Sequence, residues 1–294
     1  MSAAAASLQG QVAGRSLWAD AWAKLKRNRA AVVGAWIIGA MAVLVIVGPY
    51  FSRHAYDATD FANTSIGPSW STAHFFGTDT LGRDLFVRTL YGGRISLLVG
   101  IVATAVSLLI GVTYGAVAGY VGGRVDALMM RIVDILYALP FMFFVILLMV
   151  FFGRNIVLIF VAIGAINWLD MARIVRGQTL SLKHREFVEA AQAQGVGAAA
   201  IIRRHIVPNL LGVVAVYVTL TIPQVILVES FLSFLGLGVQ EPMTSWGALV
   251  NDGSRELESA PWMLIFPAVF LATTLFCFNF LGDGMRDALD PKDR

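Results

Sequence analysis

Long stretches without a charged side chain constrain this sequence more than any other feature. Of its residues 57% are hydrophobic and only 14% are charged, whereas soluble domains carry about 25% charged residues. About 20 consecutive apolar residues cross the hydrocarbon core of a membrane. The apolar runs do not alternate with a period of two, which disfavours membrane-spanning strands. The sequence therefore predicts an all-α integral membrane protein.

Six uncharged or nearly uncharged runs are candidates for transmembrane helices. The first exceeds the apolar region of a cleaved signal peptide, about 7–15 residues, and no convincing A-x-A site follows it, so we expect a retained anchor. The uncharged run of the third candidate begins at Ile135, but we expect the helix itself to begin nearer Leu128. The fourth run is the weakest, because Asp170 interrupts it. The six runs cover residues 30–52, 95–121, 135–152, 155–172, 210–235 and 262–282.

The distribution of lysine and arginine predicts which segments face the cytoplasm. If the N-terminus is cytoplasmic, six spans bring the C-terminus to the same side. Of the 22 basic residues, those left outside are then Arg53, Arg83, Arg88, Arg94, Arg154 and Arg255. This asymmetry satisfies the positive-inside rule. We therefore expect a cytoplasmic segment at 1–29, a first helix at 30–52, a periplasmic segment at 53–94, a five-helix core at 95–283 with a cytoplasmic loop at 173–208, and a cytoplasmic tail at 284–294.

Motifs of catalysis and nucleotide binding are missing. The four lysines (Lys24, Lys26, Lys183 and Lys292) never follow a glycine, so there is no phosphate-binding G-x-x-x-x-G-K-[ST] loop. The histidines form no H-E-x-x-H zinc motif, and no G-x-S-x-G nucleophile elbow is present. The lone Cys277 gives no disulfide framework. We expect a non-catalytic chain that binds no metal or cofactor itself, so another chain must supply energy for uphill transport.

One acidic residue lies deep within a predicted span. Glu229 follows an uncharged stretch that begins at Val207, and it comes after Pro223. An acid inside a span should face a polar cavity or a partner group rather than lipid. Two roles are compatible with this position: lining a translocation path together with Pro223, or making a structural hydrogen bond. Our hypothesis is that Glu229 lines the path.

Local spacing suggests further contacts near the ends of the spans. Asp84 and Arg88 are four residues apart near an expected helix start, and Arg131 and Asp134 are three apart, so each pair can form an ion pair along one helix. Trp246 suits a position at the membrane interface.

Small residues recur at every fourth position of the second predicted span. Such a stripe allows another helix to approach closely. The stripe could pack against a helix of the same chain or against a second membrane subunit. Its members are Ala103, Ser107, Gly111, Gly115 and Gly119.

The charged, alanine-rich stretch "EFVEAAQAQGVGAAAIIRRHIVPN" stands out between two spans. Its helix-forming residues predict a helix from Glu186 to Gln194, ended by Gly195 and Gly197, and a second helix can follow before Pro208. Such a segment could dock in a groove of another protein or lie on the bilayer surface. The mostly small and apolar face of the first helix comprises Phe187, Ala190, Ala191 and Gln194.

"EAAQAQG" (Glu189 to Gly195) resembles the EAA loop of permeases from ATP-binding-cassette (ABC) importers. Two positions depart from the family pattern: His205 stands where isoleucine is usual, and Val207 where leucine is. In that family the loop docks into a cleft on a cytoplasmic ATPase. The resemblance implies ATPase coupling by Glu186, Phe187, Glu189, Ala190, Ala191, Gln194, Gly195 and Pro208.

The likeness extends over most of the chain. "WAKLKRNRAAVVGAW", "HFFGTDTLGRDLFVRTLYGGRISLLVG", "ESFLSFLGLGVQEPMTSWGALVNDG" and "FNFLGDGMRDALDPKDR" resemble segments of peptide permeases, most closely the C-type subunits of bacterial oligopeptide importers. The resemblance implies a type I permease fold with six spans, located in the bacterial inner membrane.

The resemblance also implies partners. They are a second, B-type permease, two ATPases that bind ATP and Mg²⁺, a periplasmic or extracellular peptide-binding protein, a peptide substrate and membrane lipid; no nucleic acid is expected. We expect two outer segments, residues 53–94 and about 236–261, to help to receive the binding protein. Related permeases for dipeptides or nickel share these motifs, so they remain alternatives. A stand-alone secondary carrier is the alternative from another class, and it predicts flux through this chain alone.

Overall fold

The computed structural model describes residues 17–153 and 155–289; the ends of the two predicted cytoplasmic termini, residues 1–16 and 290–294, and Arg154 lie outside the described residues. Within these ranges the regular structure is helical, and two isolated bridges, Ser69–His74 and Thr78–Asp84, pair extended backbone. The elements are α1 (Leu17–Arg27), α2 (Arg29–Val47), η1 (Gly48–Phe51), η2 (Phe61–Asn63), α3 (Leu85–Val121), α4 (Gly123–Ala138), α5 (Phe141–Phe152), α6 (Ile156–Leu182), α7 (Glu186–Ala193), α8 (Ala198–Ile201), η3 (Ile202–Ile206), α9 (Val207–Phe234), α10 (Trp246–Arg255) and α11 (Trp262–Leu289).

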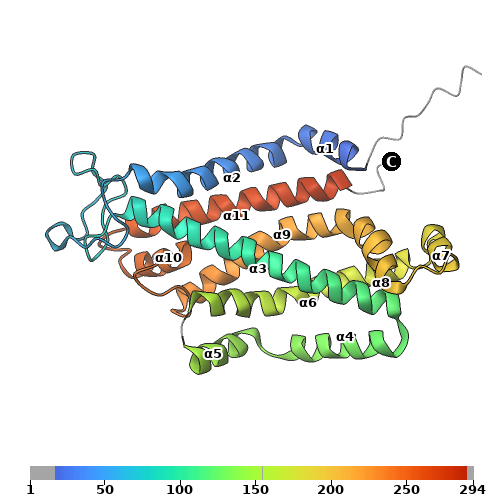
Figure 1. Ribbon diagram of the computed structural model, residues 1–294. Helices are drawn as coiled ribbons and strands as arrows, with labels where there is room; N and C mark the ends of the chain where they lie inside the picture. The colour runs from blue at the N-terminus through green and yellow to red at the C-terminus, as the bar shows by residue number, and fades with distance from the viewer. Residues whose placement is uncertain (1–16, 154, 290–294) are drawn as a thin grey trace, which may run out of the picture.

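The long helices form an elongated bundle with two distinct ends (Figure 1). α3 lies along α6, α2 along α11, and α9 contacts α11, α3 and α6. The segment between α2 and α3 lies with α10 at one end, which we call the loop end. The helices α1, α7 and α8 lie at the opposite end, which we call the α7 end.

The predicted number of spans is not confirmed. Among the residues that the structure describes, four helical stretches are long and apolar enough to cross a membrane: Arg29–Phe51, Leu85–Val121, Ala198–Phe234 and Trp262–Leu289. A fifth span arises if α4 and α5 count as one bent pair. The weakest predicted span, which corresponds to α6, is not among them.

The third predicted span is broken rather than continuous. α4 and α5 meet at an angle of 82°. Leu139, between them, has the extended conformation (φ −74°, ψ 129°) and precedes Pro140. Proline disfavours helical backbone in the residue before it, so the Leu139–Pro140 step ends α4.

The small-residue stripe faces a helix of the same chain. Cβ atoms added at Gly111, Gly115 or Gly119 would lie within 2.4–2.8 Å of α6 atoms, among them the carbonyl oxygens of Ala172 and Arg176. Ser107, another member of the stripe, is buried and donates a hydrogen bond to the Ala103 carbonyl oxygen (2.8 Å). The glycines therefore allow the backbones of α3 and α6 to touch.

The interfacial position predicted for Trp246 is wrong. Its side chain is fully buried, and Nε1 donates a hydrogen bond to the Thr89 carbonyl oxygen of α3 (2.9 Å). A Cβ at Gly93 would lie 2.6 Å from the Trp246 ring. Trp246 thus anchors α10 on α3, because a buried indole N–H needs an acceptor.

Candidate functional site

The predicted helix at the α7 end is confirmed. α7 runs from Glu186 to Ala193, and Gln194 is its C-cap. Glu186 and Glu189 occupy its first turn, where negative charge interacts favourably with the helix dipole. Helix propensity, the dipole and the terminating glycine therefore all favour the same short helix.

Gly195 ends α7 in a left-handed conformation. Its φ is +77°, and its N–H donates to the Gln192 carbonyl oxygen (2.9 Å) while the Val196 N–H donates to the Ala191 carbonyl oxygen (3.1 Å). This pair of hydrogen bonds is the Schellman motif. Gly197 differs, since its φ is −65°. Gly195 therefore fixes the direction in which the chain leaves α7.

The two sides of α7 have different surroundings. Glu186, Phe187, Glu189, Ala190 and Gln194 are exposed, and Phe187 retains 41% of its accessible surface. Ala191 is instead buried with Val188 in a core cluster shared with α3, α6 and α9. The predicted face is therefore divided: most of it is free for a partner, while Ala191 fastens α7 to its own chain.

After α7 the chain becomes helical again at Ala198 and remains helical into α9. α8 leads through the π-helical turn η3 into α9, and Pro208 lies in the first turn of α9, where a missing N–H costs little. Ile201 and Ile206 are buried in the same cluster as Val188. The α7 segment thus rests directly on the start of a long helix.

Glu229 lies in a buried network at the loop end of α9. Its side chain is 0% exposed, and its carboxylate accepts hydrogen bonds from Ser96 of α3 (3.1 Å) and Ser233 (2.7 Å). Ser245, the N-cap of α10, donates to Ser233 (3.1 Å). Glu229 therefore joins α3, α9 and α10. This geometry favours the structural alternative, while the predicted path role of Glu229 and of Pro223, which is also buried, stays a prediction.

Replacing Glu229 tests both roles. We expect Glu229→Leu to lower the free energy of unfolding by about 2–4 kcal/mol, because two buried hydroxyl groups lose their acceptor. Glu229→Gln retains one acceptor oxygen and should cost less. Unfolding of the purified chain in detergent measures this difference. Unchanged substrate transport by Glu229→Gln at normal expression would contradict the path role, and equal stability of Glu229→Leu and the unaltered chain would contradict the structural one.

A buried charge cluster ties the loop end to α3. The Asp79 carboxylate contacts Arg83 (Nε, 2.6 Å) and Arg88 (Nε, 3.4 Å), and all three side chains are buried. Asp79 also accepts hydrogen bonds from the backbone N–H groups of Leu81 and Arg83 (2.9 Å each). The cluster fixes the turn before α3. This helix begins at Leu85, near the expected helix start and ten residues before the predicted span, and Asp84 caps it through the Val87 N–H (2.8 Å).

Both ion pairs predicted from local spacing are wrong. Arg88 contacts Asp79, and Asp84 contacts His74 (2.8 Å). Asp134 pairs with Arg173 of α6 (2.8 Å) rather than with Arg131. Asp134 pairs with a residue of another helix because tertiary packing brings α4 against α6.

Sequence reasoning also missed a bidentate pair between α4 and α6. Arg176 donates to both oxygens of Asp126 (2.7 and 2.6 Å). A planar guanidinium matches a carboxylate in this way. The two residues are fifty positions apart, so no local spacing could have indicated the pair.

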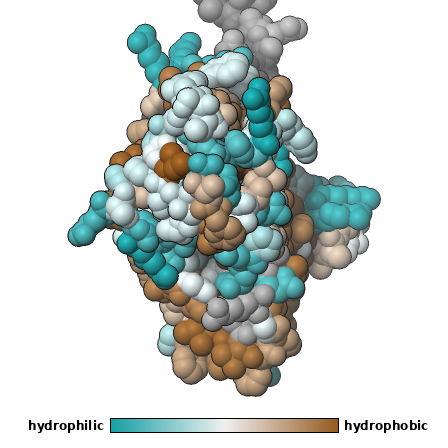
Figure 2. Space-filling view, turned by 90° about the vertical axis from the view of Figure 1, so that its left-hand side faces the viewer, coloured by the Kyte–Doolittle hydropathy of each residue, from teal (hydrophilic) through white to brown (hydrophobic). Residues whose placement is uncertain are grey.

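A polar pocket of about 280 Å³ opens beside the buried charge cluster, lined by Asp79, Thr80, Leu81, Arg83, Glu241, Asp252, Arg255, Glu256 and Met263. Figure 2 shows the loop end, where hydrophilic and weakly polar residues cover most of the surface and hydrophobic residues gather at the lower edge, over α5. Such a surface suits contact with a water-soluble partner.

Asp252, which lines this pocket, makes the stability of the fold depend on pH. Burial raises the pKa of Asp252, and Arg88 only partly opposes this effect. The folded state then binds more protons than the unfolded state, so stability falls as pH rises from the unfolded pKa of about 4 to the raised pKa. We expect Asp252→Asn to raise the melting temperature at pH 7, with the gain disappearing toward about pH 4. Melting curves across this range, with exposed Asp57→Asn as control, measure the effect; a gain that is independent of pH would contradict it.

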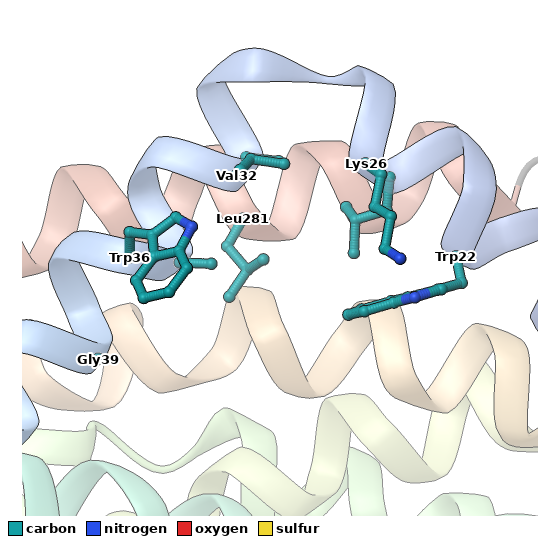
Figure 3. A pocket seen from close by; sticks show the side chains of 9 residues that line it. Trp22, Lys26, Val32, Trp36, Gly39 and Leu281 are labelled. Atoms are coloured by element: carbon teal, nitrogen blue, oxygen red, sulfur yellow. The ribbon is translucent and has the colours of Figure 1, made fainter.

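A separate groove of about 520 Å³ lies between α1, α2 and α11 (Figure 3). Trp22, Trp36 and Leu281 line it, and Lys26 contributes the one charged side chain, with Nζ 5.1 Å from the Trp22 ring. The groove offers few polar groups for the main chain of a peptide, and its apolar lining suits a lipid chain.

Two protein-family models and several proteins of named function match this chain. The family described as "Binding-protein-dependent transport system inner membrane component" matches residues 111–294, and "N-terminal TM domain of oligopeptide transport permease C" matches residues 16–68. The oligopeptide transport system permease protein OppC of Escherichia coli (strain K12) is 62% identical over 97% of this chain and 94% of its own length. OppC of Haemophilus influenzae is 61% identical over 97% of this chain and 91% of its own length. The dipeptide transport system permease protein DppC of Bacillus subtilis is 49% identical over 94% of this chain and 86% of its own length.

Proposed function

The chain belongs to the family of inner membrane components of binding-protein-dependent transport systems, and from that premise we propose that it is the membrane subunit of an ATP-driven importer of oligopeptides. The observation that carries this proposal is the 62% identity, over nearly the whole of both chains, to a protein named an oligopeptide transport permease. The protein resides in the bacterial inner membrane and crosses it several times.

We propose six spans with both termini in the cytoplasm. The basic segments 1–29 and 173–208 include α1 and α7, and these helices lie at the same end of the bundle (Figure 1). Such a shared basic end is what the positive-inside rule requires of a cytoplasmic face. In this topology the segment 53–94 and α10 face the periplasm, and the tail 284–294 returns to the cytoplasm.

We propose that α7 couples this chain to a cytoplasmic ATPase. The exposed Glu186, Phe187, Glu189, Ala190 and Gln194 would enter a groove of the partner, and the Gly195 turn would set the orientation of α7. Because Val188 and Ala191 pack in one cluster with residues of α3, α6 and α9, a push on α7 would move the start of α9. This movement would bias the bundle between two states of access.

The chain performs no catalysis in this scheme. Two partner ATPases bind ATP and Mg²⁺ and carry out hydrolysis. A second, B-type permease supplies the other half of the path, and a peptide-binding protein delivers cargo to the loop end, where hydrophilic and weakly polar residues cover most of the surface (Figure 2). A lipid chain would occupy the groove that Trp22 and Trp36 line.

Growth on defined peptides tests the cargo. A bacterium that lacks its own copy of this subunit but retains the partner chains should regain growth on peptides of three or more residues when this chain is expressed. Restoration on dipeptides alone would instead support the dipeptide alternative, which the relative DppC favours. Restoration of nickel uptake without peptide uptake would support a nickel permease. Either outcome would contradict an oligopeptide importer.

A further inference from the structure

Three side chains with metal-binding atoms converge at the loop end, outside the sites described above. His54 follows η1, His74 lies in the segment between η2 and α3, and Asp84 is the N-cap of α3. One nitrogen or oxygen atom from each lies within 4.8 Å of the others. His74 Nδ1 is 2.8 Å from Asp84 Oδ2, and the two imidazole rings stack with their centroids 4.3 Å apart.

The His54 ring has an unused coordinating atom in this cluster. Its Nε2 is buried without a hydrogen-bond partner among the described residues. A buried polar atom without a partner costs about 1–3 kcal/mol. His74 and Asp84 are buried as well, so the cluster concentrates nitrogen and oxygen donors where water has little access. A bound cation would use the electron pairs that packing alone leaves unsatisfied.

We propose that His54, His74 and Asp84 form a zinc site that fastens the segment between α2 and α3 to the start of α3. Two imidazoles and one carboxylate suit Zn²⁺, whereas Mg²⁺ and Ca²⁺ prefer oxygen ligands. Donor atoms about 2.0 Å from a tetrahedral zinc ion lie about 3.3 Å from one another. The His74–Asp84 separation of 2.8 Å is close to this value, and the His54 ring, which now stacks on His74, would turn so that its in-plane electron pair points at the ion.

The surroundings of the cluster also suit a bound metal ion with three protein ligands and one water molecule. Asp84 uses its other oxygen, Oδ1, to cap α3 through the Val87 N–H (2.8 Å), so its position is fixed independently of the metal. Zinc would replace the proton shared by His74 Nδ1 and Asp84 Oδ2. His54 is only half-buried, which leaves the fourth coordination position to water. The segment that zinc would hold contains little regular structure besides η2 and the isolated bridges.

Zinc binding by the full chain tests this proposal. The chain is purified in detergent with a tag that contains no histidine, treated with a chelator and titrated with zinc chloride, and bound metal is measured by equilibrium dialysis. We expect one zinc ion per chain and a rise in melting temperature on binding. His54→Ala should weaken binding by about tenfold or more and remove the rise. His54→Ala is the primary variant, because the buried Nε2 has no hydrogen bond to lose.

Two further variants make the result specific. His74→Ala should weaken binding like His54→Ala, whereas His184→Ala, which changes an exposed histidine at the other end of the molecule, should bind zinc like the unaltered chain. Failure of the unaltered chain to bind zinc would overturn the proposal. Equal zinc binding by His54→Ala and the unaltered chain would overturn it too.

Discussion

Replacing Gly195 with leucine is expected to lower peptide uptake by about tenfold while the chain still reaches the membrane. Gly195 has a φ of +77°, a conformation that costs an L-residue with a side chain about 1–2 kcal/mol. That cost changes a conformational equilibrium by a factor of about 5–30. A Cβ at this position would meet no atom within 4 Å, so backbone strain rather than a clash would shift the chain out of the Schellman turn and change the orientation of α7 toward the ATPase.

Gly197→Leu is the matched control for this change. Gly197 also has open space around it, but its φ of −65° is accessible to leucine. Gly195→Asn is a second control, since asparagine tolerates the left-handed conformation. Uptake and ATP hydrolysis are measured together in vesicles that contain the complete importer. Full uptake by Gly195→Leu would contradict the coupling role of α7.

Replacing Asp79 with alanine is expected to lower the free energy of unfolding by about 3–5 kcal/mol. The change leaves the buried Arg88 guanidinium without its ion-pair partner, while Arg83 loses Asp79 and keeps only Glu241 (2.9 Å). An uncompensated buried charge carries a cost of this size. It also removes the acceptor for the Leu81 and Arg83 N–H groups. The turn before α3 should then lose its order first.

Chemical unfolding of the purified chain measures this effect. Asp79→Asn keeps the shape of the side chain and should cost nearly as much, because charge rather than shape is lost. Asp57→Ala, at an exposed position of the same segment, should change stability little. Equal stability of Asp79→Asn and the unaltered chain would show that the charge cluster does not hold the loop end.

Local patterns predicted helices well where propensity and capping agree. The helix at Glu186–Ala193 was predictable because good helix formers precede a glycine that can adopt positive φ. The predicted span began only at Ile95, ten residues after the start of α3, because Arg88 and Arg94 interrupt the apolar run. In the fold both side chains have partners: Arg88 forms an ion pair with Asp79, and Arg94 donates a hydrogen bond to the Val45 carbonyl oxygen (2.6 Å).

Tertiary contacts account for the parts that the sequence could not predict. Asp134 and Arg173 are 39 positions apart, and Trp246 finds its acceptor in Thr89, 157 positions away. No helical spacing rule extends to such distances. The same limit applies to Glu229, because its two roles differ only in what surrounds it: a buried acid bonded to Ser96 and Ser233 has the same sequence pattern as an acid that lines a path.

Isolation of the tagged chain from its native membrane in mild detergent tests the central claim most directly. A coupling subunit should be recovered together with a second permease and two ATPases, and the chain alone should give no flux in liposomes. The Gly195→Leu variant should then recover less ATPase than the Gly197→Leu control. Recovery of the chain without partners, together with substrate flux through liposomes that contain only this chain, would contradict the account and support a stand-alone secondary carrier.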